Sequence, residues 1–132
     1  MSRLTIFLAR YIGLSTIVLV LAMAVRGSAT VEATMADAPV VLSYGIISLG
    51  LGMAMIVGHN VWRGGALPVV VTVVGWLIAA KGLALLLLPP DAVTPVLGQM
   101  HYGANYYLYL APAFVLGVYL AWAGFTTPAI RG

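Results

Sequence analysis

The chain has no cysteine and very few charged residues. Without cysteine, disulfide bonds, thiolate metal sites and cysteine nucleophiles are excluded. Only 7% of the 132 residues are charged, whereas 63% are hydrophobic. A soluble domain needs a polar shell that this composition cannot supply, so the composition predicts a protein whose solvent is a lipid bilayer.

The common signatures of enzymes are also missing. The sequence contains no HExxH, no paired carboxylates, no Ser-His-Asp set, no phosphate-binding glycine loop and no haem attachment motif. Its two histidines, His59 and His101, are expected on opposite sides of the membrane, where they cannot share a metal ion within one chain. We therefore expect no catalytic residue, no metal site and no cofactor.

The basic residues do not form a patch. The net charge is +3, but each Lys or Arg stands alone in the sequence. A surface that binds nucleic acid needs clustered basic side chains, so we expect no nucleic-acid partner and interpret the positive charge as a signal of membrane topology. The residues are Arg3, Arg10, Arg26, Arg63, Lys81 and Arg131.

Four apolar runs are long enough to cross a membrane. A helix rises about 1.5 Å per residue, so about 20 apolar residues cross a hydrocarbon layer about 30 Å thick. We predict an all-α membrane protein with four transmembrane helices in an antiparallel bundle, as one domain over residues 1–132, with loops at 26–39 and 91–105. The expected spans are about 4–25, 40–59, 67–88 and 106–125.

The first span has a second interpretation, as a secretory signal. Ala22, Met23 and Ala24 resemble the small-residue cleavage site that follows the apolar region of a signal peptide. Arg10 would interrupt that apolar region, whereas in a spanning helix its long side chain can reach the headgroups. We therefore favour a retained span.

The distribution of charge predicts the orientation. Cytoplasmic loops of membrane proteins carry an excess of Lys and Arg. The N-terminal segment, the link between the second and third spans and the tail carry Arg3, Arg10, Arg63 and Arg131 and no acid. The other two loops carry Arg26 with Glu32, Asp37 and Asp91. This asymmetry predicts that both termini are cytoplasmic.

Small residues predict where the helices pack. Small side chains allow helix backbones to approach closely in a membrane. The second span has small residues on two opposite faces, so we expect it to be sandwiched between neighbouring helices. One face carries Gly45, Ser48 and Gly52, and the other carries Gly50, Ala54 and Gly58. In the third and fourth spans the corresponding residues are Gly75, Ala79, Gly117 and Gly124.

The polar residues near the cytoplasmic link are the candidates for function. A functional interpretation makes His59 a proton-responsive group and Asn60 a hydrogen-bonding partner, in one cluster with Arg10 and Arg63. The structural interpretation, which we favour, is that His59 and Asn60 cap a helix and fix the turn. The complete candidate set is Arg10, His59, Asn60, Trp62, Arg63 and Lys81.

Lys81 lies in the third span, near its outer end. We favour an extended side chain that reaches the headgroups over an ion pair. If Lys81 forms an ion pair, the acids available in the chain are Glu32, Asp37 and Asp91, and a partner subunit is the other source.

Three segments around the link between the second and third spans form a recognisable pattern. They are Gly58–Trp62, with its His-Asn-x-Trp turn, the Thr-x-x-Gly-Trp pattern within Val69–Leu77, and Lys81–Gly82. In these segments the sequence resembles a family of small four-helix bacterial inner-membrane proteins. The resemblance implies a multi-pass protein of the bacterial inner membrane and singles out His59, Asn60, Trp62, Trp76 and Lys81. It implies no chemistry for them.

These observations favour a structural or accessory role. We expect the protein to pack as a homo-oligomer or as a subunit of a larger membrane complex, with the lipid bilayer and itself or another membrane protein as partners. The alternative is a small channel or proton-coupled transporter with Arg10, His59 and Asn60 at its cytoplasmic mouth. The spans have few polar residues at mid-membrane depth, which disfavours a dedicated transport site.

Overall fold

The computed structural model describes residues 1–89, 91–101 and 103–128, without the side chains of Thr94 and Leu97. These residues form helices and connecting turns, and no strand occurs among them. The helices are α1 (Arg3–Arg26), α2 (Ser28–Met35), α3 (Ala38–Gly58), α4 (Ala66–Leu87), α5 (Val93–Gln99) and α6 (Tyr106–Thr126).

The four long helices, α1, α3, α4 and α6, are long and apolar enough to cross a membrane. Each begins and ends within two residues of the expected span. The predicted class, an all-α membrane protein with four transmembrane helices, is therefore confirmed.

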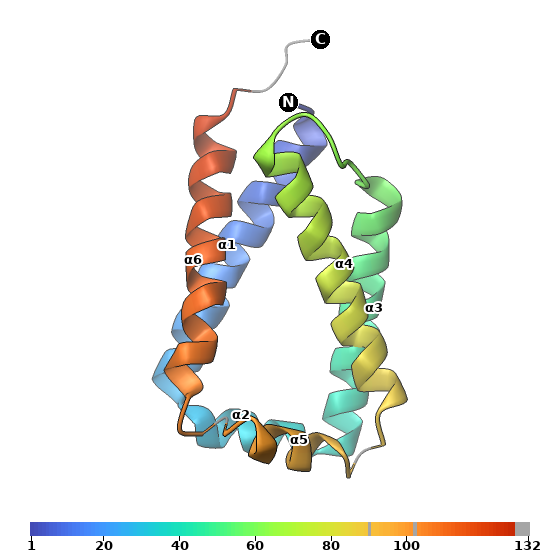
Figure 1. The fold of residues 1–132 in the computed structure, drawn as a ribbon, viewed down its shortest axis with the longest axis vertical. Helices are drawn as coiled ribbons and strands as arrows, with labels where there is room; N and C mark the ends of the chain where they lie inside the picture. Colours follow the sequence, from blue (N-terminus) through green and yellow to red (C-terminus); the bar gives the residue numbers. More distant parts are fainter. Residues whose placement is uncertain (90, 102, 129–132) are drawn as a thin grey trace.

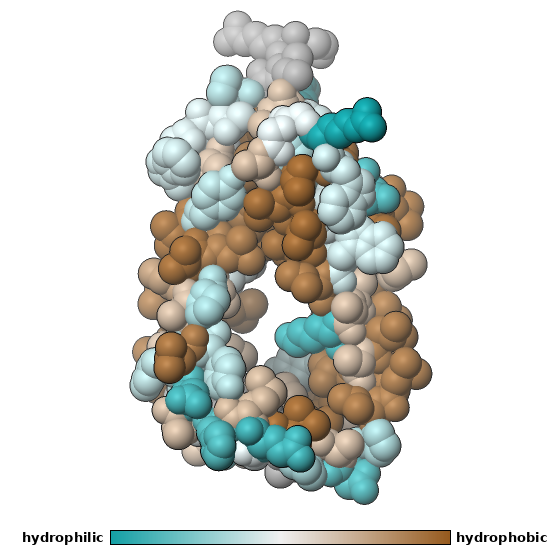
Figure 2. Space-filling model, in the orientation of Figure 1, coloured by the Kyte–Doolittle hydropathy of each residue, from teal (hydrophilic) through white to brown (hydrophobic). Residues whose placement is uncertain are grey.

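The four spans are arranged as two antiparallel pairs, α1 with α6 and α3 with α4 (Figure 1). The pairs meet at the end that holds the N-terminus and the link between α3 and α4, which we call the convergent end. They separate toward the other end, where α2 and α5 lie across the gap. The space-filling view shows an opening through the molecule between the pairs (Figure 2). The bundle is therefore closely packed at one end only.

Local signals explain where the spans begin and end. The Ser2 hydroxyl accepts a hydrogen bond from the Thr5 backbone N–H at the start of α1, over 3.1 Å. Gly27, with φ +85°, ends α1 in a conformation that favours glycine. Asp37 caps α3 by accepting from the Val40 N–H over 3.2 Å, and Pro39 lies in the first turn of that helix.

Glycines set the spacing within both pairs. A Cβ on Gly52 of α3 would lie 2.6 Å from the Ala79 Cα of α4, and one on Gly82 of α4 would lie 2.8 Å from the Leu49 Cα. In the other pair, a Cβ on Gly13 of α1 would lie 2.9 Å from the Ala121 Cα of α6. Each pair is therefore held at a distance that only small residues permit.

The two pairs share an apolar core at the convergent end. It contains side chains from α1, α3, α4 and α6, and Ile78 and Leu116 pack against it. Its buried members are Ala9, Ile12, Met55, Leu67, Val71, Val74, Leu120 and Ala123. This core explains why the pairs meet at this end.

The predicted loops at 26–39 and 91–105 each contain a short helix, so the expectation of loops was wrong there. Within them lie α2 and α5, which contact each other below the opening. The segments are rich in small and polar residues and lack the apolar pattern that marks a span. Next to a bilayer, however, a helix satisfies its own backbone hydrogen bonds, and this favours helix over loop.

The sequence predicted that α3 is sandwiched between neighbouring helices, and this prediction was wrong. The face with Gly45 and Gly52 packs on α4. On the opposite face, Gly50 and Gly58 have no atom within 4 Å of an added Cβ, and Ala54 is exposed. Only one of the two small-residue faces is therefore used within the chain.

Candidate functional site

His59 joins three of the spans at the convergent end. It directly follows α3, and only 3% of its surface is exposed. Its Nε2 lies 2.8 Å from the Thr5 hydroxyl of α1, and its Nδ1 lies 3.2 Å from the Thr72 hydroxyl of α4. Both threonines are also buried. We call these three side chains the Thr5–His59–Thr72 network.

The network can satisfy all its polar atoms internally. The Thr72 Oγ1 accepts a hydrogen bond from the Val61 N–H over 3.0 Å and donates to the Val61 carbonyl over 2.9 Å. The Nδ1–H of a neutral His59 ring then donates to Thr72, and the Thr5 hydroxyl donates to Nε2. The Ser2 hydroxyl lies 2.7 Å from the Thr5 hydroxyl and extends the series of hydrogen bonds toward the N-terminus. No acceptor or donor of the imidazole is left for a ligand.

Asn60 organises the two tryptophans of the link and of α4. Its Oδ1 accepts from the Trp62 indole N–H over 2.7 Å and from the Trp76 indole N–H over 3.4 Å. Gly64 and Gly65 reverse the chain with φ of +93° and +114°, values that favour glycine. The residues of the His-Asn-x-Trp turn therefore contact each other and the first half of α4.

Arg10 lies apart from this network, whereas the functional interpretation placed it in one cluster with His59 and Asn60. Its Nε donates to the Gly124 carbonyl of α6 over 2.8 Å, and its guanidinium carbon lies 4.8 Å from the Phe125 ring centroid. Hydropathy gives the depth of Arg10 in α1 but not the side of the helix on which it lies. Arg10 joins α1 to α6 instead.

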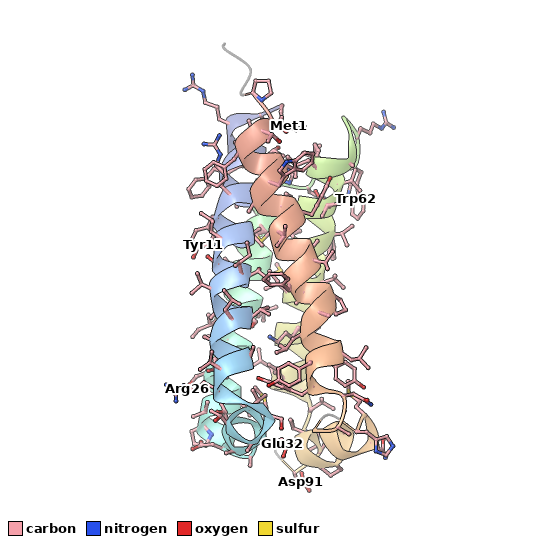
Figure 3. The ribbon with its side chains drawn as sticks, turned by 90° about the vertical axis from the view of Figure 1, so that its left-hand side faces the viewer. Met1, Tyr11, Arg26, Glu32, Trp62 and Asp91 are labelled. Carbon is pink, nitrogen blue, oxygen red and sulfur yellow. The ribbon has the colours of Figure 1, made fainter. Side chains whose placement is uncertain are left out.

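The last two candidates, Arg63 and Lys81, are also separate from the network. Arg63 is exposed in the link, and Lys81 is exposed in the second half of α4. The structure therefore brings together His59, Asn60 and Trp62, and leaves Arg10, Arg63 and Lys81 outside that group. Figure 3 shows Met1 and Trp62 toward the convergent end, and Arg26, Glu32 and Asp91 at the other end.

Most of the expected packing residues lie at helix contacts. Gly45, Gly52, Gly75, Gly117 and Gly124 each face a neighbouring helix, Ala79 contacts Gly52, and Ser48 is half-buried. Gly50, Ala54 and Gly58 lie on the open face of α3.

Three residues with a clear structural role were missed in the sequence. Gly13 and Gly82 make the closest backbone contacts of the two pairs together with Gly52. Thr5 belongs to the buried network. It lies three residues after Ser2, which is the spacing between a helix N-cap and the backbone N–H that it accepts from, and this spacing could have drawn attention to Thr5.

The described residues contain no group of three or more His, Cys, Asp or Glu side chains that could hold a metal ion. They also contain no buried side-chain nitrogen or oxygen without a hydrogen-bond partner. Compared with protein-family models, curated proteins and solved structures, the chain has no match. The contacts of His59, which directly follows α3, join α1 and α4 to the end of that helix.

Proposed function

We propose that this membrane protein has a structural or accessory role and packs through the open face of α3 against a second copy or a helix of another membrane protein. The observation that carries the proposal is the contrast between the two faces of α3. The Gly45 and Gly52 face packs closely on α4, whereas Gly50, Ala54 and Gly58 have the same small size and face away from the chain. Such a face lets a second backbone approach closely.

The polar network supports the same role. The ring nitrogens of His59 are occupied by two threonines, and the Oδ1 of Asn60 is occupied by two indoles. These residues fix the turn between α3 and α4 and thereby set the direction in which the open face of α3 points.

The proposed location is the bacterial inner membrane, with the convergent end in the cytoplasm. Arg3, Arg10 and Arg63 lie toward that end, and Glu32 and Asp91 lie toward the other (Figure 3). The positive-inside rule supports this orientation. Arg131, which also entered the sequence argument, lies outside the described residues.

The proposal is tested by enlarging one face of α3 at a time. Gly50→Leu adds a side chain where no atom lies within 4 Å, so we expect the folded monomer to remain intact and assembly to be lost. Ala80→Leu is the matched control, because Ala80 is exposed on α4. The measurements are crosslinking in native membranes and the mass of the complex in mild detergent. Unchanged assembly of Gly50→Leu would contradict the proposal.

The alternative, a channel or proton-coupled transporter, is supported less by these contacts. A transport role for His59 requires a path by which protons reach the ring, and both ring nitrogens contact threonines instead. Proton or ion flux into sealed vesicles that contain the protein would favour this alternative over an accessory role.

A further inference from the structure

Lys81 lies on the side of α4 that faces the opening between the helix pairs. Val74 and Ile78 of α4 pack on the core shared with α1 and α6. Lys81 comes seven residues after Val74 and three residues after Ile78, and these helical spacings place it on the same side of α4. It lies farther from the convergent end than the core where the pairs meet. Gly75 and Gly82, which contact α3, lie on another side. Figure 2 shows hydrophilic surface at the α4 edge of the opening.

The ammonium group of Lys81 is attached within the membrane-spanning part of α4. Lys81 precedes the last residue of α4, Leu87, by six positions, which corresponds to about 9 Å along the helix axis. A charged side chain at such a depth is costly and requires a partner or contact with the headgroups. Lys81 therefore needs an anion or water near the opening.

None of the residues that the structure describes supplies such an anion. Lys81 forms no hydrogen bond or ion pair with any residue that the structure describes. The Asp37 carboxylate caps α3. The Glu32 carboxylate lies beside Gly103, in the turn before α6, where its Oε1 is 3.1 Å from the position that a Cβ on Gly103 would take. The acids of the chain thus lie near α2 and α5, whereas Lys81 is attached to α4 six residues before the last residue of that helix, Leu87.

We propose that the opening binds a lipid with an acidic headgroup, whose acyl chain lies between the helix pairs and whose anionic group pairs with Lys81. The apolar core closes the opening at the convergent end and offers an acyl chain an apolar surface that includes Ile78 and Leu116. Because the opening passes through the molecule, a chain can enter sideways from the surrounding bilayer (Figure 2). The positive charge of Lys81 selects the acidic headgroup over a zwitterionic one. This inference is independent of the contact proposed for the outer face of α3.

The proposal is tested by native mass spectrometry of the whole protein in mild detergent, with three probes. These are phosphatidylglycerol, phosphatidylcholine with the same acyl chains, and oleate. The unmodified protein is expected to bind an acidic probe about tenfold more tightly than phosphatidylcholine, which corresponds to about 1.4 kcal/mol. Preference for phosphatidylglycerol identifies a phospholipid as the ligand, whereas preference for oleate identifies a free fatty acid. Equal binding of all three probes would overturn the proposal without any variant.

Variants locate the site. Lys81→Gln is expected to remove the tenfold preference and Lys81→Arg to keep it, because only the second retains the charge. Arg26→Gln is the matched control, since Arg26 is an exposed cation at the same end of the molecule. A preference that persists in Lys81→Gln, or that is lost equally in Arg26→Gln, would show that the opening does not select the lipid. Assembly measured on the same samples separates this result from failure of the α3 contact.

Discussion

The substitution Thr72→Val tests whether the Thr5–His59–Thr72 network holds the helices together. The side chain is nearly isosteric and the site is 1% exposed, so the change removes a hydroxyl without opening a large cavity. The variant loses the contacts of Oγ1 with the His59 Nδ1 at 3.2 Å, the Val61 N–H at 3.0 Å and the Val61 carbonyl at 2.9 Å.

The expected loss follows from these contacts. A side-chain hydrogen bond between membrane helices contributes about 0.6 kcal/mol on average, and a buried polar group left without a partner costs about 1–3 kcal/mol. With the buried imidazole nitrogen left unpaired and the Val61 groups partly open to solvent, we expect unfolding to become easier by about 2 kcal/mol. This free energy corresponds to about a 30-fold change in the folding equilibrium.

The assay is reversible unfolding in mixed micelles, followed by far-UV circular dichroism as sodium dodecyl sulfate is increased. Thr126→Val is the matched control, because the exposed Thr126 hydroxyl donates a hydrogen bond to the carbonyl of Trp122 in its own helix, over 2.8 Å. We expect the control to change the unfolding free energy by less than about 0.5 kcal/mol. If the two variants unfold alike, the network does not stabilise the fold and the structural interpretation of His59 is wrong.

Two further pairs of variants test other contacts in the same unfolding assay. Gly52→Ala, whose Cβ would overlap the α4 backbone, should destabilise by about 1–3 kcal/mol, whereas Gly50→Ala should change stability by less than about 0.5 kcal/mol. Equal effects would contradict the close contact of α3 and α4. Tyr106→Phe removes a buried hydroxyl that donates to the Met23 carbonyl over 2.5 Å and should cost about 1 kcal/mol. Tyr107→Phe, at an exposed site with a 3.5 Å contact, is its control and should cost less than half as much.

Hydropathy was sufficient to predict the spans, because the thickness of the bilayer sets the length of an apolar run. It could not predict which helices pair, because it reports the depth of a residue and not its direction around the helix axis. Arg10 illustrates the difference: its depth in α1 was predicted, but it faces Gly124 and Phe125 of α6 rather than His59. The contact of α1 with α6 involves Gly117 and Gly124 of α6 together with Gly13, a single glycine of α1 that carries no repeating pattern.

The two small-residue faces of α3 could not be ranked from the sequence. Both have helical spacing and similar residues, and nothing within α3 distinguishes them. The choice depends on α4, where Ala79 and Gly82 supply the complementary small residues that let Gly52 and Leu49 approach. The sequence placed three of the candidate polar residues, His59, Asn60 and Trp62, in one short turn. The structure adds Thr5 and Thr72, which contact His59 but are distant from that turn in the sequence.

The convergence of the two helix pairs at one end gives the protein the shape of a wedge (Figure 1). Its cross-section is small in the leaflet next to the link between α3 and α4 and larger in the leaflet next to α2 and α5. The surrounding lipids therefore lose more area to the protein in one leaflet than in the other. Many copies in one patch would impose an area difference on the bilayer, and such a difference favours membrane that curves toward the narrow end.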